Sequence, residues 1–244
     1  DKIVPQSIAY WFQNCSALTT ITNITNLYWA DCTSFYHTFY GCSSLVNLDL
    51  RGWDTSSIIT MQAMFYGCTS LQTVNVTGWD TSNVKNMRYL FGVGSATNTT
   101  MAFTNIIGLD TWDTSSVTDM LGMFCRCNLL TSLDLSGWDV SNVSDMSYMF
   151  RECSVLDSID GLDTWSTDSL TTLRHMFYKC TVITELDLSS WDTSNVTDMA
   201  YTFYNCSSLT TIYASSLWSN SNVSAGTGTF QRLFKFGWWQ WYYL

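Results

Sequence analysis

The 244-residue chain has a formal net charge of −10, since 20 Asp and Glu residues outnumber 10 Lys and Arg residues. This balance argues against nucleic acid as a partner, because phosphate binding requires clustered Lys and Arg. Hydrophobic residues make up 46% of the chain, which is ample for a core, and only 12% are charged. Ser, Thr and Asn supply the polar surface instead, a composition typical of exported surface proteins. The sequence contains no run of about 18 apolar residues, so no transmembrane segment is predicted.

A repeat of 26 or 27 residues organises nearly the whole chain. Its clearest copy is Leu186–Cys206, and related copies are Leu48–Cys68, Val74–Gly94, Leu133–Cys153 and Ile159–Cys180. One phenylalanine marks each copy, at Phe12, Phe39, Phe65, Phe91, Phe124, Phe150, Phe177, Phe203 and Phe230. A single longer step of 33 residues indicates an insertion at about 92–103. An unbroken period of this length predicts one elongated solenoid of about nine coils.

Each repeat contains two extended segments. The first, for example Leu45–Leu50, alternates apolar and polar residues as a half-buried strand does. The Trp-Asp-Thr-Ser-Asn segment that follows favours a turn, and Val-Thr-Asp-Met returns to alternation. Helical and extended conformations both remain open for the final Met-Phe-Tyr-x-Cys segment. The predicted fold class is a mainly β repeat solenoid with a parallel sheet on one face and a right-handed path.

The repeat also resembles that of a known family. Met-Phe-x-x-Cys-Ser-Ser-Leu-Thr-x-Leu-Asp-Leu-Ser, paired with Trp-Asp-Thr-Ser-Asn-Val-Thr-Asp-Met, is similar to the repeat of BspA-type leucine-rich-repeat surface proteins. The resemblance covers about residues 8–217 and implies a leucine-rich-repeat-like solenoid outside the cell, concerned with adhesion or surface architecture. The chain departs from the pattern at Gly94, where Cys is expected, and at Ser166 and Ser219, where Asp is expected.

The solenoid is predicted to span residues 1–229, followed by an aromatic segment at 230–244. This segment has eight aromatic residues in fifteen and is too short to span a bilayer. Two interpretations remain open: the segment folds back as a cap, or it forms an interface that joins solenoids head to tail. The candidate residues of this assembly end are Trp238, Trp239, Trp241, Tyr242 and Tyr243.

No catalytic, cofactor or metal site is predicted. Most cysteines lie three residues after the repeat Phe, and this register favours buried free thiols over disulfides. Cys32 and Cys125 lie off that register and are the better candidates for a bridge. His37 and His175 share a position that tolerates Tyr, Ala and Gly, which predicts exposure to solvent. They would lie five coils apart, and no serine gains a base from the repeat, so the chain is predicted not to be an enzyme.

Aspartates recur in three registers of the repeat: after the Trp, before the Met and near the end of the strand. Two interpretations are open for them. Each carboxylate accepts backbone N–H groups in its own turn, which is the favoured interpretation. Alternatively, carboxylates aligned in successive coils hold Ca²⁺ between them.

Two surfaces of the repeat are candidate binding faces. The first is the polar face of the strands, with Asn47, Asp49, Asn75, Asp134, Glu185, Asp187 and Tyr213. The second is an aromatic stripe, with Tyr40, Tyr66, Tyr89, Tyr148, Tyr178, Tyr201 and Tyr204. Tyrosine suits protein or sugar contacts, although these residues could simply cover the flank of the solenoid.

Sequons for N-glycosylation occur along the chain, and the candidates are Asn98, Asn142, Asn195 and Asn222, with Asn98 in the insertion first. These features together predict an extracellular or cell-surface protein without cofactors. It would bind a protein or glycan on another cell or in the matrix through its repeat faces. The alternative is a structural subunit of an extracellular filament or surface layer, joined head to tail through its ends.

Overall fold

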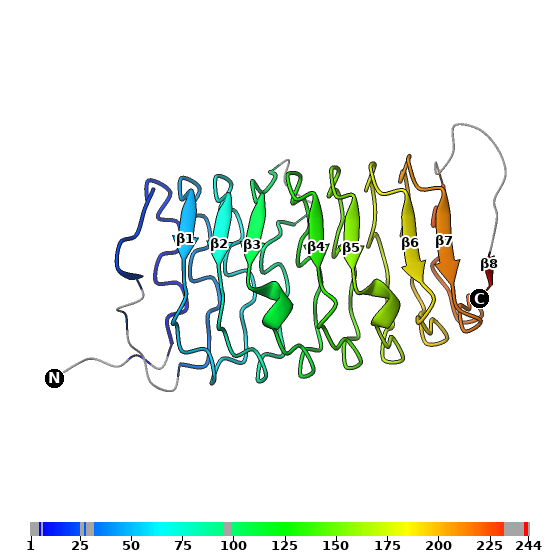
Figure 1. Ribbon diagram of the computed structural model, residues 1–244, viewed down its shortest axis with the longest axis horizontal. Helices are drawn as coiled ribbons and strands as arrows, with labels where there is room; N and C mark the ends of the chain where they lie inside the picture. Colours follow the sequence, from blue (N-terminus) through cyan, green and yellow to red (C-terminus); the bar gives the residue numbers. More distant parts are fainter. Residues whose placement is uncertain are drawn as a thin grey trace.

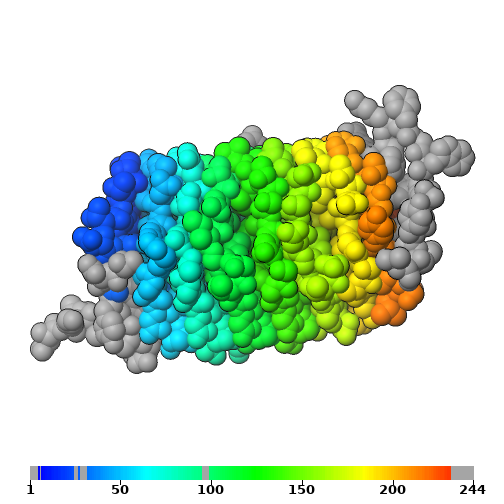
Figure 2. All heavy atoms as spheres, in the orientation of Figure 1, coloured from blue at the N-terminus to red at the C-terminus, as the bar shows by residue number. Residues whose placement is uncertain are grey.

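A computed structural model shows the chain as an elongated stack of coils that follow one another in sequence order (Figure 1). The structure describes residues 5, 7–24, 27, 32–94, 99–231 and the backbone of 242–243. Its strands and 3-10 turns are β1 (Asn47–Asp49), β2 (Thr73–Asn75), β3 (Asn105–Ile107), η2 (Leu109–Thr111), β4 (Ser132–Asp134), β5 (Ser158–Asp160), η3 (Leu162–Thr164), β6 (Glu185–Leu188), β7 (Thr211–Ala214) and β8 (Tyr242–Tyr243). The space-filling view shows successive coils as adjacent bands along the rod (Figure 2).

All paired strands are parallel and in register, with one buried residue opposite the next, as for Leu48, Val74 and Ile106. This arrangement confirms the predicted mainly β solenoid with a parallel sheet on one face. The predicted count of about nine coils is too high for the sheet. Strands β1 to β7 come from seven successive repeats, those of Phe39 to Phe203. The first repeat, that of Phe12, forms turns but no strand in its described part.

The sheet is also divided, which the repeat pattern does not predict. Its strands form three groups, β1-β2-β3, β4-β5 and β6-β7-β8. Both breaks follow a coil with one extra residue before its Trp, where Gly108 or Gly161 starts a 3-10 turn at positive φ. That residue displaces the chain after β3 and β5, so the strand of the next coil does not pair with them.

The same displacement changes the hydrogen bonds of the tryptophans. In regular coils the indole Nε1–H donates to a carbonyl of the preceding coil, as from Trp79 to Leu50 at 3.0 Å and from Trp138 to Leu109 at 3.0 Å. Trp112 and Trp165, which follow η2 and η3, are fully buried, and their Nε1 atoms have no hydrogen-bond partner among the described residues. The extra residue therefore moves the indole away from its usual acceptor.

A second, continuous line of parallel bridges runs along the rod through Ser34, Thr60, Asn86, Asp119, Asp145, Thr172, Asp198 and Ala225. It corresponds to the predicted second extended segment and contributes one residue from each coil. The described coils thus remain joined on this side even where the sheet is divided.

The segment around each repeat Phe consists of successive tight turns, and we call this surface the turn flank. Backbone N–H groups alternate between two kinds of acceptor. The N–H of Ala63 donates to Arg88 of the next coil at 2.8 Å, and that of Met64 donates within its own turn to Met61 at 3.2 Å. Ala63 has a φ of 53°, as the third residue of a type II turn requires. The conformation is therefore neither helical nor a regular strand.

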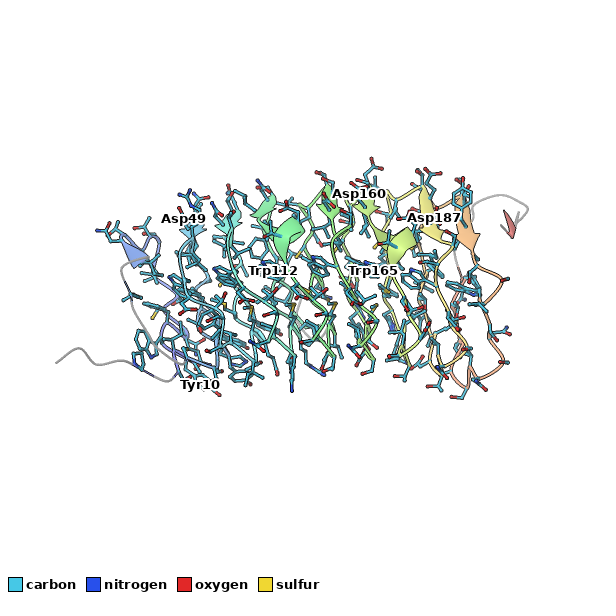
Figure 3. All side chains as sticks on the ribbon, turned by 60° about the horizontal axis from the view of Figure 1, so that its bottom comes forward. Tyr10, Asp49, Trp112, Asp160, Trp165 and Asp187 are labelled. Atoms are coloured by element: carbon cyan, nitrogen blue, oxygen red, sulfur yellow. The ribbon has the colours of Figure 1, made fainter. Side chains whose placement is uncertain are left out.

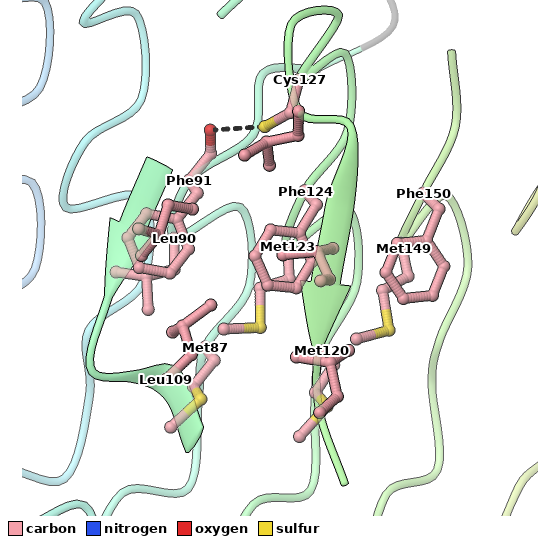
Figure 4. Packing of buried hydrophobic residues seen from close by; sticks show 14 of the residues in the cluster. Met87, Leu90, Phe91, Leu109, Met120, Met123, Phe124, Cys127, Met149 and Phe150 are labelled. Carbon is pink, nitrogen blue, oxygen red and sulfur yellow. Dashed lines mark hydrogen bonds between the residues drawn. The ribbon is translucent and has the colours of Figure 1, made fainter. Parts of the chain in front are cut away.

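Stacked phenylalanines form the centre of the core. Phe150 lies between Phe124 and Phe177, with ring centroids 5.8 Å and 5.5 Å apart, and all three are fully buried. Methionines from the same coils fill the space beside the rings (Figure 4). In the insertion, Phe103 packs edge-on against Phe91 at 5.6 Å, so the second half of this segment belongs to the core.

The cysteines are free thiols, as predicted for the aligned series. Cys32 and Cys125 are also free and buried, so the prediction that they are candidates for a bridge is wrong. Each buried member of the series donates its S–H to the Phe carbonyl of the preceding coil, for example Cys153 to Phe124 at 3.0 Å and Cys180 to Phe150 at 3.1 Å. Figure 4 shows the corresponding bond from Cys127 to Phe91. The thiol thus serves as a small apolar side chain with one donor.

Thiol labelling tests this arrangement. Burial raises the pKa of the Cys153 and Cys180 thiols well above the usual value, and the thiolate is the reactive form. Both should label slowly with a maleimide under native conditions, whereas exposed Cys15 should label at once. Mass spectrometry of labelled peptides measures this. Rapid labelling at Cys153, or a mapped disulfide between neighbouring cysteines of the series, would contradict the structure.

The aspartates of the three registers accept hydrogen bonds in turns, as the favoured interpretation predicts, except Asp160, whose carboxylate has no donor among the described residues. Asp54 accepts the backbone N–H of Ser56 at 3.1 Å, Asp134 that of Ser136 at 3.1 Å, and Asp198 that of Ala200 at 2.8 Å. These three represent the three registers of the repeat. Hydrogen bonds from Ser136 also lower the pKa of the Asp134 carboxyl.

Chelation should therefore have little effect on stability. We expect EDTA to leave the melting temperature nearly unchanged, because the aligned carboxylates other than Asp160 already accept hydrogen bonds from their own turns. Differential scanning fluorimetry with and without EDTA measures this. A large drop that Ca²⁺ restores would favour the calcium interpretation, since a ligand of the native state raises stability by mass action.

Candidate binding face

Alternate residues of each strand point away from the core and form the sheet face. Five of the predicted residues are exposed there, namely Asn47, Asp49, Asp134, Glu185 and Asp187, and two are half-buried, namely Asn75 and Tyr213. The parallel register sets Asp49 beside Asn75 and Asp187 beside Tyr213. Figure 3 shows Asp49, Asp160 and Asp187 along one side of the rod.

The division of the sheet opens two grooves on this face. A groove of about 720 Å³ lies at the break between β5 and β6 and is lined by Asp157, Ser158, Ile159, Asp160, Gly161, Leu162, Asp163, Thr184, Glu185, Asp187 and Tyr213. A smaller groove of about 240 Å³ lies at the break between β3 and β4, with Asp110 and Asp134 among its lining residues. Both grooves are therefore acidic.

The larger groove concentrates uncompensated negative charge. Of its five carboxylates, only Asp187 has a hydrogen-bond donor, the backbone N–H of Ser189 at 3.0 Å. Within the described part of the chain, the other four carboxylates have neither a hydrogen bond nor an ion pair, and no Lys or Arg lines the groove. These side chains are free to meet a partner.

Five arginines of the described residues form ion pairs outside this groove. The described ion pairs are Arg51–Asp49 at 2.6 Å, Arg88–Asp119 at 3.4 Å, Arg126–Glu152 at 3.1 Å, Arg151–Glu152 at 3.0 Å and Arg174–Asp198 at 3.3 Å. The Arg51 guanidinium also holds the pKa of the Asp49 carboxyl below its usual value. Apart from this pair, these arginines belong to the turn flank or its border.

The predicted aromatic stripe lies on the turn flank, where all of its tyrosines are half-buried. Tyr40 stacks on Tyr66 with centroids 4.9 Å apart, and Tyr178 stacks on Tyr204 at 5.1 Å, with the planes within 7° in both pairs. The facing sides of these rings are therefore covered by each other. This favours the interpretation in which the tyrosines cover the flank.

The prediction that the two histidines are exposed is wrong. His175 lies between Tyr148 and Tyr201, 5.0 Å from each ring centroid. In the part of the chain that the structure describes, the buried Nδ1 atoms of His175 and His37 have no hydrogen-bond partner. What the members of this position share is a backbone with positive φ, 56° at His175, so the repeat fixes a turn conformation there and not an exposed side chain.

This environment predicts a pH-dependent stability. Burial, with help from Arg151 and Arg174, lowers the pKa of His175 to about 4. The unfolded chain takes up this proton near pH 6.5 and the folded chain only near pH 4, so stability should fall as pH drops through this window. We expect His175→Tyr, which matches the residue at this position in neighbouring coils, to remove about 1–2 kcal/mol of that fall, a discounted figure because the ring is half-buried. Urea unfolding at several pH values measures the free energy of unfolding of both proteins. The same dependence of this free energy on pH in the wild type and the variant would contradict the prediction.

The sequons are exposed but structurally engaged. The side-chain amides of Asn142, Asn195 and Asn222 donate to a carbonyl of the preceding coil at 2.8, 2.8 and 2.6 Å. A glycan on any of these nitrogens would replace one hydrogen atom and disturb that bond. Asn98 lies outside the described residues, and its glycosylation stays a prediction.

At the C-terminal end, Trp238, Trp239 and Trp241 lie outside the described residues. The backbone of Tyr242 and Tyr243 forms β8, which pairs in parallel with β7. The edge of β7 is thereby occupied by the chain itself, which favours the cap over the head-to-tail interface.

Other kinds of site find no support in the described residues. They contain no group of three or more His, Cys, Asp or Glu side chains placed to hold a metal ion. No helix in this part of the chain is long and apolar enough to cross a membrane. Sequence reasoning overlooked Asp157 and Asp163 in the larger groove, although the extra residue at Gly161 was a visible signal that this coil differs.

Comparison with known proteins adds the following. The DUF285 family, described as "Mycoplasma protein of unknown function", matches residues 6–102, 95–212 and 133–238, which together cover nearly the whole chain. No curated protein matches the chain. Among solved structures it is similar to a leucine-rich repeat protein from Bacteroides ovatus, determined at 1.19 Å resolution, with 18% sequence identity and a TM-score of 0.28. That similarity covers 81% of this chain and 67% of the other.

Proposed function

Because the chain belongs to the DUF285 family and folds as a repeat solenoid, we propose that it is a non-enzymatic cell-surface protein that binds a protein or glycan partner through its sheet face. The acidic groove between β5 and β6 carries this proposal. Four of its carboxylates have no partner among the described residues, whereas the recurrent aspartates of the turns accept backbone hydrogen bonds.

Physical arguments support the choice of this face. Like charges that share a groove repel one another, and this cost is recovered when a complementary surface covers them. Repeat proteins use their extended faces in this way, since successive coils present a broad, rigid surface. The turn flank presents fewer groups to a partner, because its arginines are in ion pairs and its tyrosines stack on one another.

Site-directed blocking tests the proposal. A polyethylene glycol chain attached at Ser158→Cys would cover the sheet face, and the same chain at Ser56→Cys would cover a turn elsewhere, since both residues are exposed. Cys15→Ser in both proteins removes the exposed native thiol. Surface plasmon resonance against a panel of matrix proteins and glycans should find a retained partner. Blocking at residue 158 should abolish retention, and blocking at residue 56 should not. Absence of any retained partner, or equal effects at both sites, would overturn the proposal.

A further inference from the structure

Three successive coils depart from the repeat at one exposed position. The fifth residue after the repeat Phe is Ser44, Ser70 or Ser208 in three other coils, and Ala17 or Ala96 in the coils of Phe12 and Phe91. In the coils of Phe124, Phe150 and Phe177 it is Leu129, Val155 and Val182, whose exposed fractions are 50%, 36% and 38%. We call these three residues the apolar stripe.

The stripe is continuous and borders the acidic groove. Its members occupy equivalent positions in adjacent coils, which are joined beside them by the hydrogen bonds from Asp157 to Thr131 at 2.8 Å and from Thr181 to Ser154 at 2.9 Å. Each residue lies shortly before β4, β5 or β6. Two residues after Val155 the chain reaches Asp157, which lines the groove.

The other side of the stripe carries a net positive charge among the described residues, because Arg126 and Arg151 share the single carboxylate of Glu152. The Arg151 guanidinium pairs with Glu152 at 3.0 Å and lies 4.6 Å from the centre of the Tyr178 ring, and the Lys179 ammonium lies 5.2 Å from the same ring. The unpaired negative charge therefore lies only on the groove side of the stripe, and the cations of a partner would have to face that side.

We propose that the apolar stripe and the groove form one docking surface for a cationic amphipathic segment of another protein. The proposal rests on the proposed function and names its partner class. Exposed Leu and Val favour apolar side chains over a metal ion or a highly charged glycan. The unpaired carboxylates favour Lys or Arg and disfavour acidic partners, and the Tyr213 ring at the groove offers a cation–π surface.

Defined peptides test the proposal. The probe is a fluorescein-labelled peptide of four Lys-Leu repeats, compared with peptides of four Lys-Ser and four Glu-Leu repeats, and binding is measured by fluorescence anisotropy. Only the Lys-Leu peptide should bind well. The combined change Leu129→Ser, Val155→Ser and Val182→Ser restores the residue found in other coils and should weaken binding about tenfold or more. The combined change Asp160→Asn, Asp163→Asn and Glu185→Gln should do the same.

Matched controls distinguish binding at this surface from non-specific binding. Ile59→Ser with Leu217→Ser removes two other exposed apolar side chains. The charge control combines Asp54→Asn, Asp80→Asn and Asp139→Asn. It removes as many negative charges as the groove variant, and Asn can still accept the turn hydrogen bond. Both controls should bind within about twofold of the wild type.

Several results would overturn the inference. Equal losses in the groove variant and its charge control would indicate non-specific attraction, and equal binding of the Lys-Ser peptide would show that the stripe is not used. Calcium binding by calorimetry that the groove variant abolishes, without peptide binding, would make the groove a cation site. If no peptide binds but blocking at residue 158 still abolishes retention of a matrix partner, this inference fails and the proposed function stands.

Discussion

Replacement of Phe150 with Ala is expected to lower the free energy of unfolding by about 3–5 kcal/mol, the usual cost of truncating a buried aromatic residue. The ring is fully buried and stacks between Phe124 and Phe177. Truncation leaves a cavity that neighbouring coils cannot close, because hydrogen bonds on both sides fix their spacing. Chemical denaturation followed by circular dichroism measures the loss.

Phe12→Ala is the matched control. Phe12 has the same repeat position and stacks on Phe39 at 5.1 Å, but it is only partly buried, and within the described part of the chain it stacks on a phenylalanine on one side alone. We expect a loss of about 1–2 kcal/mol there. Equal losses at both positions, or less than about 1 kcal/mol at Phe150, would contradict a continuous phenylalanine column.

Replacement of Gly161 with Ala should cost about 2–5 kcal/mol, from backbone strain and from overpacking together. Gly161 has a φ of 95°, and a Cβ atom there would lie 2.4 Å from Ser136 Cα and 2.6 Å from its backbone nitrogen. Both contacts are with backbone of the preceding coil, which cannot move without breaking the β4–β5 pairing. Thermal and urea unfolding measure the effect.

Gly52→Ala measures the cost of backbone strain without overpacking. Gly52 has a φ of 80°, but nothing lies within 4 Å of its added Cβ atom. Its loss should be about 1–2 kcal/mol, and the difference between the two variants reports the clash with Ser136. Equal losses would show that η3 does not pack closely against the preceding coil.

The period of the sequence predicts the core because each coil places the same residue at the same point. The Phe at every 26 or 27 residues becomes a stacked column, and the aligned cysteines become buried thiols. The turn role of the aspartates also follows from the residue type, since Asp accepts the N–H two residues ahead.

The division of the sheet could not be predicted in the same way. A single extra residue at Gly108 or Gly161 is visible in the sequence, but whether a coil absorbs it by a bulge or by a 3-10 turn depends on contacts with the preceding coil. The histidine error has a similar origin. Variation at the position of His175 predicts exposure, whereas the constraint is a backbone with positive φ that His, Tyr, Ala and Gly all adopt there.

The site was located only in outline. Alternation along the strands correctly assigned Glu185 and Asp187 to the sheet face. The groove that makes this face distinctive requires the break between β5 and β6, and the apolar stripe requires comparison of exposed positions between coils. Neither feature belongs to the average repeat, because both arise where individual coils depart from it.

Amide hydrogen exchange with and without the retained partner tests the central claim, which is that a partner binds the sheet face over β4, β5 and β6. Binding should slow exchange within residues 129–134, 155–160 and 182–188 and leave the turn flank near Tyr40 and Tyr66 unchanged. The isolated protein and the Asp160→Asn, Asp163→Asn, Glu185→Gln variant provide the references. Protection confined to the turn flank, or to the ends of the rod, would contradict the account.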